Sequence, residues 1–148
     1  MIVNHQRHLR APIGELENFL VRVRRALRLG RRNLTVALVS EAEIARLNRT
    51  FRGKDKATDV LSFPAEAGNG KQGSRARRGG GAPFYLGDIA ISPRVAQRNA
   101  RRFQRTLPDE LRVLILHGVL HLLGYDHESD NGEMNRKEQR LRRQLGLA

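Results

Sequence analysis

Apolar residues recur along the chain at spacings that predict alternating helices and strands. In the segment 13–29 they return every three or four residues, as on one face of a helix. Similar patterns, with a Ser or Thr at the start, predict helices over 40–51, 93–103 and 106–123. Apolar periodicity alone predicts a last helix over 132–145. Short apolar runs predict strands over 2–6, 34–39, 60–63 and 84–91, the last broken at Gly87-Asp88. Phe103 is expected on the inner face of its helix.

The helix that carries Leu111 to Leu123 is apolar on nearly every side, which is typical of a central buried helix. Helices and strands follow one another irregularly, and the strands are few. We therefore predict an α+β fold in which a small mixed four-stranded sheet packs with about five helices. Layering of the α/β type is the alternative. The 148 residues suit a single domain over 1–148.

The segment 65–83 differs from the rest of the chain. It is rich in Gly and basic residues and has no apolar periodicity. Such a segment has little to bury, so we predict a flexible loop inside the domain. It is either a segment that grasps RNA or an insertion that the fold tolerates, and the second interpretation is the simpler one.

The net positive charge of the chain indicates which classes of molecule it binds. The chain has 28 Lys and Arg against 15 Asp and Glu, a formal net charge of +13. Such an excess favours polyanions, either nucleic acid or an anionic membrane. Most of these cations are Arg, so a compositional bias is the alternative explanation. There is no Cys, and neither a signal peptide nor an apolar stretch of membrane-spanning length is visible. We expect a soluble cytoplasmic protein with no membrane contact.

Three of the five histidines lie within eleven residues, in the segment HGVLHLLGYDH. His117 and His121 are four residues apart, so both project from one face of a helix. Gly124 can end that helix and allow His127 to approach from the side. Three imidazoles on one ion leave a fourth position open, the pattern of a catalytic zinc. The sequence therefore predicts one zinc ion held by His117, His121 and His127.

The same spacing, HxxxHxxGxxH, occurs in zinc proteases, with one difference. Proteases need a Glu directly after the first His as the general base. This chain has Gly118 there, and Gly cannot accept a proton. The predicted metal geometry is kept while the protease base is missing, which argues against ordinary peptidase chemistry.

A basic segment precedes the strand at 60–63. Arg52, Lys54 and Lys56 flank Gly53 in a polar stretch. This arrangement favours anion binding, and Arg52 can hold a phosphate with two parallel hydrogen bonds. The alternative is that Arg52 pairs with a nearby carboxylate, Asp55 or Asp59, and only holds the loop.

Together these segments resemble the YbeY family, the bacterial endoribonucleases and ribosomal-RNA maturation factors. The resemblance rests on LNRTFRGKDKATDVLSFP at 47–64, GDIAIS at 87–92 and HGVLHLLGYDH at 117–127. It covers most of the chain but not the segment 65–83. The resemblance therefore does not predict the shape of the RNA-binding groove.

The resemblance implies a zinc-dependent, single-strand-specific endoribonuclease. Such proteins mature the 3′ end of the small-subunit 16S rRNA and act in ribosome quality control, so ribosomal RNA and the small subunit are the implied partners. The metal ligands of the family correspond to His117, His121 and His127, and its functional arginine to Arg52. No small-molecule cofactor is expected. The alternative is a non-enzymatic RNA-binding assembly factor with a structural zinc. The sequence does not select a general base among Asp126, Glu128, Asp59 and Asp88.

Overall fold

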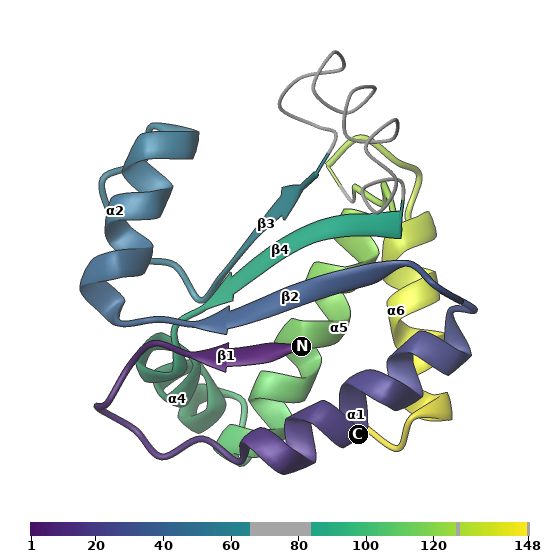
Figure 1. Ribbon diagram of the computed structural model, residues 1–148, viewed down its shortest axis with the longest axis horizontal. Coiled ribbons are helices and arrows are strands. Elements are labelled where there is room, and N and C mark those ends of the chain that lie inside the picture. Colours follow the sequence, from purple (N-terminus) through teal and green to yellow (C-terminus); the bar gives the residue numbers. More distant parts are fainter. Residues whose placement is uncertain (66–83, 127, 148) are drawn as a thin grey trace.

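A computed structural model of the chain describes residues 1–65, 84–126 and 128–147. The loop predicted at 65–83 therefore lies, apart from Ala65, outside the described residues. The predicted α+β fold is confirmed: in the described part of the chain, five helices pack around a four-stranded mixed sheet (Figure 1). The strand order is β1-β2-β4-β3. Strands β1 (Ile2–Asn4), β2 (Asn33–Leu38) and β4 (Tyr85–Ile91) run parallel, while β3 (Val60–Pro64) is antiparallel to β4 and forms one edge.

The alternation of side chains along the strands separates two apolar clusters. Val36, Ile89 and Ile91 point into the main core, which is covered by α1 (Ile13–Ala26) and α5 (Leu107–Leu122). Ala90 points to the other face and packs with Ile44 of α2 (Glu41–Arg52) in a smaller cluster. Figure 1 shows α2 on one side of the sheet and the other helices gathered on the opposite side.

The three helix starts predicted from a Ser or Thr are confirmed by hydrogen bonds. The Ser40 side chain accepts from the backbone N–H of Glu43 at 3.1 Å and begins α2. Ser92 caps α4 (Pro93–Arg102) in the same way, and Thr106 caps α5. The last helix, α6 (Glu133–Gln144), buries the apolar residues that its periodicity selects, namely Met134 and Leu141, with Leu145 as its C-cap. Within the described ranges no helix is long and apolar enough to cross a membrane.

Several sequence-based boundaries were wrong. Strand β1 ends at Asn4 rather than at Gln6. Helix α1 ends at Ala26 rather than near Leu29, because Arg28 adopts a left-handed conformation with φ 53°. Strand β4 is not broken at Gly87-Asp88: its register with β2 shifts by one residue there, and the chain stays in the sheet. A Cβ at Gly87 would lie 2.3 Å from the carbonyl oxygen of Phe63, so only glycine fits. Phe103 is not inward: α4 ends at Arg102, and the Phe103 side chain is exposed.

Helix α5 is the central helix that the sequence predicts. Ten of its residues are buried, and it packs against both β3 and β4. Gly118 sits where α5 packs against Ile89 of β4. A Cβ at this position would lie 2.9 Å from both Cδ1 and Cγ2 of Ile89. The missing side chain is therefore what allows the helix to approach β4 this closely.

Replacing Gly118 with alanine is expected to destabilise the fold. Overpacking against Ile89 costs about 1–3 kcal/mol, while alanine recovers up to about 1 kcal/mol of helix propensity. We expect a net loss of about 1–2 kcal/mol in the free energy of unfolding, measured by denaturant titration. Gly14→Ala is the control, because a Cβ on Gly14 in α1 meets nothing within 4 Å. Equal stability of the two variants would contradict the close approach.

Candidate active site

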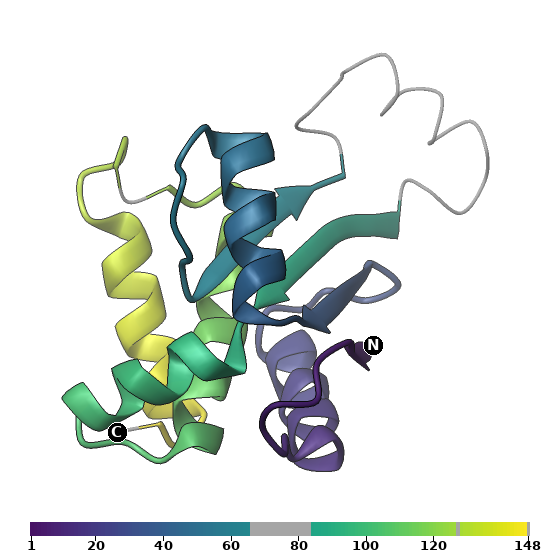
Figure 2. The ribbon, with the colours of Figure 1, turned by 90° about the vertical axis from the view of Figure 1, so that its left-hand side faces the viewer.

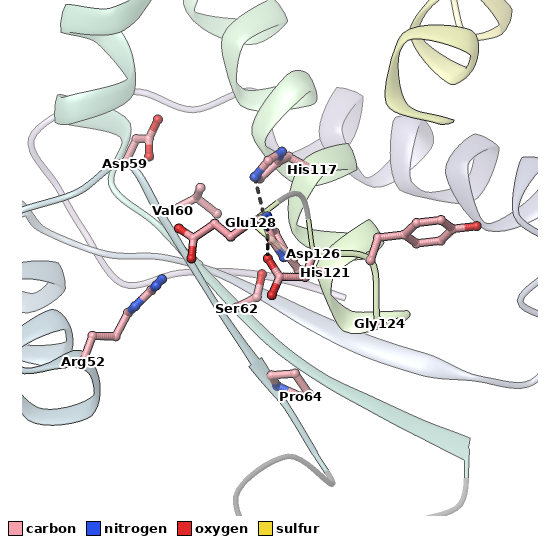
Figure 3. Close-up of a pocket in the computed structure, with 11 residues that line it drawn as sticks. Arg52, Asp59, Val60, Ser62, Pro64, His117, His121, Gly124, Asp126 and Glu128 are labelled. Atoms are coloured by element: carbon pink, nitrogen blue, oxygen red, sulfur yellow. Dashed lines mark hydrogen bonds between the residues drawn. The ribbon is translucent and has the colours of Figure 1, made fainter. Parts of the chain in front are cut away.

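A pocket of about 420 Å³ opens between the edge strand β3 and the C-terminal half of α5 (Figure 3). Strand β3 forms one wall from Val60 to Pro64, and α5 forms the opposite wall. The segment that follows α5 and the end of α2 complete the rim. The pocket is lined by polar and charged side chains from four parts of the chain: Arg52, Asp59, Ser62, His117, His121, Tyr125, Asp126 and Glu128, with Val60, Pro64 and Gly124. The fold thus brings Arg52 of the basic segment into the same pocket as His117 and His121 of the histidine-rich segment.

The two histidines on α5 face each other across one helical turn. The Nε2 atoms of His117 and His121 are 3.0 Å apart. Their ring centroids are 4.6 Å apart and the ring planes are inclined by 74°. Both rings are half-buried at the pocket wall. The predicted i, i+4 pair therefore presents two imidazole nitrogens to one point in the pocket.

Glu138 on α6 holds one of these rings from behind. Its Oε1 lies 2.7 Å from Nδ1 of His117 and its Oε2 lies 2.7 Å from Nη2 of Arg142. Burial raises the pKa of Glu138, but the hydrogen bond to His117 and the charge of Arg142 outweigh it, so the pKa lies below its usual value. An ionised carboxylate only accepts hydrogen bonds, so Nδ1 of His117 is the donor in this contact, which leaves Nε2 as the nitrogen on the side of His121.

This donor set fits a zinc ion. Zinc binds imidazole nitrogens at about 2.0–2.1 Å in a tetrahedral arrangement, which separates two ligand nitrogens by about 3.3 Å. The observed 3.0 Å between the two Nε2 atoms is close to this value. A carboxylate on the outer nitrogen of a ligand histidine is the usual partner in such sites. The third predicted ligand, His127, lies outside the described residues, and within 1–65, 84–126 and 128–147 no three suitable side chains meet around one point.

Arg52 lies at the opposite side of the pocket from the histidines (Figure 3). It is the last residue of α2 rather than the first of a loop, and Gly53 ends the helix with φ 69°. The carboxylates that could have tied it down are engaged elsewhere: Asp55 lies 3.7 Å from Arg49, and Asp59 accepts from Asn99 at 3.0 Å. Within the described ranges Arg52 forms no ion pair, so its guanidinium is exposed to the pocket.

The predicted RNA-binding lysines and the candidate general bases do not all line the histidine pocket. Lys54 and Lys56 do not line the histidine pocket and instead line an adjoining hollow that also includes Arg52. Asp59, Asp126 and Glu128 line the histidine pocket. Asp88 is not among its lining residues, and its carboxylate accepts from the hydroxyl of Tyr85 on β4. Three of the four carboxylates considered as a base therefore remain beside the histidines.

Comparisons with known proteins identify the class of protein to which this fold and site belong. A profile described as "Endoribonuclease YbeY" matches residues 3–146. A protein of this name from Nautilia profundicola is 47% identical over 116 residues, covering 78% of this chain and 74% of its own. Another from a Sulfurovum species is 37% identical over 145 residues, covering 98% and 90%.

A solved structure agrees with these matches. The solution structure of a protein from Thermotoga maritima superposes with a TM-score of 0.64 and 32% identity, covering 98% of this chain and 89% of that one. The chain thus has the fold and the sequence of a class of proteins named as nucleases that act on RNA. It belongs to the endoribonuclease YbeY family.

Proposed function

We propose that this chain is a zinc-dependent endoribonuclease that cuts single-stranded RNA. Its proposed role is maturation of small-subunit ribosomal RNA at the 16S 3′ end, together with ribosome quality control, in the cytoplasm. One observation carries the proposal: His117 and His121, oriented from behind by Glu138, share a pocket with the exposed guanidinium of Arg52. Membership of the endoribonuclease YbeY family and the net charge of +13 support an RNA substrate.

Each side chain has a distinct part in the proposed reaction. Zinc held by His117, His121 and His127 would supply a Lewis acid for the phosphate. Arg52, facing the histidines, binds the phosphate with its planar guanidinium and stabilises the negative charge that develops on the phosphate oxygens in the transition state. Arg52 thus binds the phosphodiester from the side of the pocket opposite the histidines that would hold the ion.

A carboxylate near the histidines is available to accept a proton from the nucleophile. Asp59 accepts from Asn99, and Asp126 accepts from the backbone N–H of Glu128 at 3.0 Å. In the described part of the chain, the carboxylate of Glu128 forms neither a hydrogen bond nor an ion pair, and it lines the pocket. We assign the proton acceptor to Glu128 on this basis.

The second candidate function is a non-enzymatic RNA-binding assembly factor with a structural zinc. Structural zinc sites are closed, with four protein ligands. Here the two described histidines line an open pocket of about 420 Å³. This opening favours a catalytic site over a structural one.

Incubation of zinc-loaded protein with single-stranded RNA, structured RNA and casein separates these functions. We expect cleavage of the single-stranded RNA only, and none by His121→Ala prepared in parallel. The variant also controls for contaminating ribonuclease. RNA binding without cleavage by the wild type would select the assembly factor, and digestion of casein would select a peptidase.

Glu138→Gln is expected to weaken zinc binding by about 10–100-fold, the usual effect of losing a carboxylate behind a ligand histidine. The amide keeps the size of the side chain but cannot hold the Nδ1 proton as strongly. Competition with a fluorescent chelator measures the dissociation constant. Glu133→Gln, at an exposed position on the same helix, is the matched control. An unchanged constant for Glu138→Gln would show that Glu138 only anchors Arg142.

A further inference from the structure

A second hollow, of about 390 Å³, continues from the histidine pocket. The two cavities share Arg52 and Asp59. Lys54 and Lys56 line the second hollow, and within the described ranges neither of them, nor Arg52, forms an ion pair. The carboxylate of Asp59 is held by Asn99 of α4. Among the described residues, these cations are thus not paired with a carboxylate, which suits the phosphates of a polyanion.

Helix α4 extends this basic surface away from the pocket. Asn99 lines the second hollow. Arg102, the last residue of α4, is three residues further along the same helix. Phe103 is the C-cap of α4, and its backbone N–H donates to the carbonyl oxygen of Asn99 at 3.0 Å. Figure 2 shows the segment between α2 and β3 descending beside α2 toward α4. Arg101 and Arg102 are exposed at the end of α4. A strand of RNA that passes Lys54 and Lys56 thus meets the end of α4 next.

Phe103 is a large apolar side chain left on this basic surface. Its exposed fraction is 55%. The guanidinium carbons of Arg102 and Arg105 lie 5.9 Å and 5.2 Å from the centre of its ring. Arg105 is itself held by Glu110 at 2.7 Å, and Glu110 is only 3% exposed. A buried carboxylate therefore holds Arg105 in place beside the ring of Phe103 before any ligand binds.

We propose that single-stranded RNA leaving the catalytic pocket at Asp59 passes Lys54 and Lys56 and stacks an unpaired base on Phe103. An aromatic face beside arginines is how proteins bind single strands without reading their sequence, through base stacking and phosphate contacts. A duplex cannot offer a splayed base to Phe103, so the platform favours single strands. The inference rests on the proposed function, since it describes the path of the same substrate.

The chain contains no Trp, so Phe103→Trp places a sole tryptophan, which can be excited selectively over the two tyrosines, at the proposed platform. Titration with a single-stranded oligonucleotide of about 12 nucleotides is expected to quench this tryptophan by stacking. The corresponding duplex is expected to leave it unchanged. Val21→Trp is the matched control, because Val21 is 45% exposed on α1, a helix that lines neither cavity. Equal quenching at both positions would overturn the proposal.

Affinity gives an independent measurement. Phe103→Ala is expected to raise the dissociation constant for the same oligonucleotide about tenfold, while one of about 4 nucleotides, expected to occupy only the histidine pocket and the second hollow, binds as before. An unchanged constant for the longer strand would overturn the platform. Cleavage by the wild type is followed in parallel. Quenching without cleavage would refute the nuclease and keep the RNA path, cleavage without quenching would do the reverse, and no binding would refute both.

Discussion

His121→Ala is expected to abolish RNA cleavage. The substitution removes one of the two facing imidazoles of α5, a predicted zinc ligand. The loss of activity should therefore exceed the roughly 10–100-fold loss that follows removal of a carboxylate hydrogen-bonded to a ligand histidine. Zinc content should fall well below one equivalent. The measurements are single-turnover cleavage of single-stranded RNA and metal analysis after gentle purification. His8→Ala, on the exposed N-terminal segment, controls for the loss of a histidine elsewhere.

Removal of zinc by a chelator should lower the thermal stability of the protein. Metal that binds only the folded chain, at about 100 times its dissociation constant, adds about 2.7 kcal/mol. For a chain of this size that corresponds to about 5–10 °C in Tm. We expect EDTA to lower the Tm of the wild type by this amount and to leave that of His121→Ala nearly unchanged. A wild-type Tm that does not respond to EDTA, together with low zinc content, would contradict the metal site.

Arg52→Ala is expected to lower the cleavage rate by about 10²–10³-fold, the usual effect of removing one preorganised group from a developing negative charge. Arg52→Lys should not restore the rate, because lysine keeps the charge but loses the planar fork. Tm and zinc content should not change, since Arg52 is exposed and forms no ion pair within the described ranges. Full cleavage by Arg52→Lys would contradict the phosphate clamp.

The control for Arg52 lies on the same helix. Arg46 of α2 is exposed, pairs with Glu43 at 2.6 Å and lines neither cavity. Arg46→Ala should therefore keep the wild-type rate. If Arg52 served only to hold the loop, Arg52→Ala would lower the Tm, and lysine would recover it. Measuring Tm and cleavage on all three variants separates the two roles.

The sequence predicted those parts of the site that depend on local spacing. His117 and His121 are one helical turn apart, so their shared face is set by the helix alone. Glu138 is 21 residues from His117, and only the packing of α6 on α5 brings them together. A signal was present: Glu138 falls between Met134 and Leu141 on the buried face of α6. A carboxylate in an apolar stripe indicates a buried partner.

Phe103 shows where periodicity fails. Its spacing from Ala96 and Ala100 continues the apolar stripe of α4, and the prediction extended the helix through it. The helix instead ends at Arg102, and Gln104 turns the chain with φ 55°. A hydrophobic pattern predicts which face of a helix a residue occupies only as long as the helix continues. A helix that ends at a non-glycine residue cannot be recognised from a glycine in the sequence. The strand and helix interiors, where periodicity is sustained, were predicted well.

The close contact of Gly118 with Ile89 also restricts the chemistry that this helix can host. Position 118 follows the first histidine, the place that a peptidase reserves for its catalytic glutamate. Here that position faces β4, and even a methyl group would lie 2.9 Å from Ile89. A glutamate introduced there would push α5 off the sheet before it reached any substrate. Conversion of this scaffold to a peptidase would therefore require a new spacing between helix and sheet, beyond a single substitution.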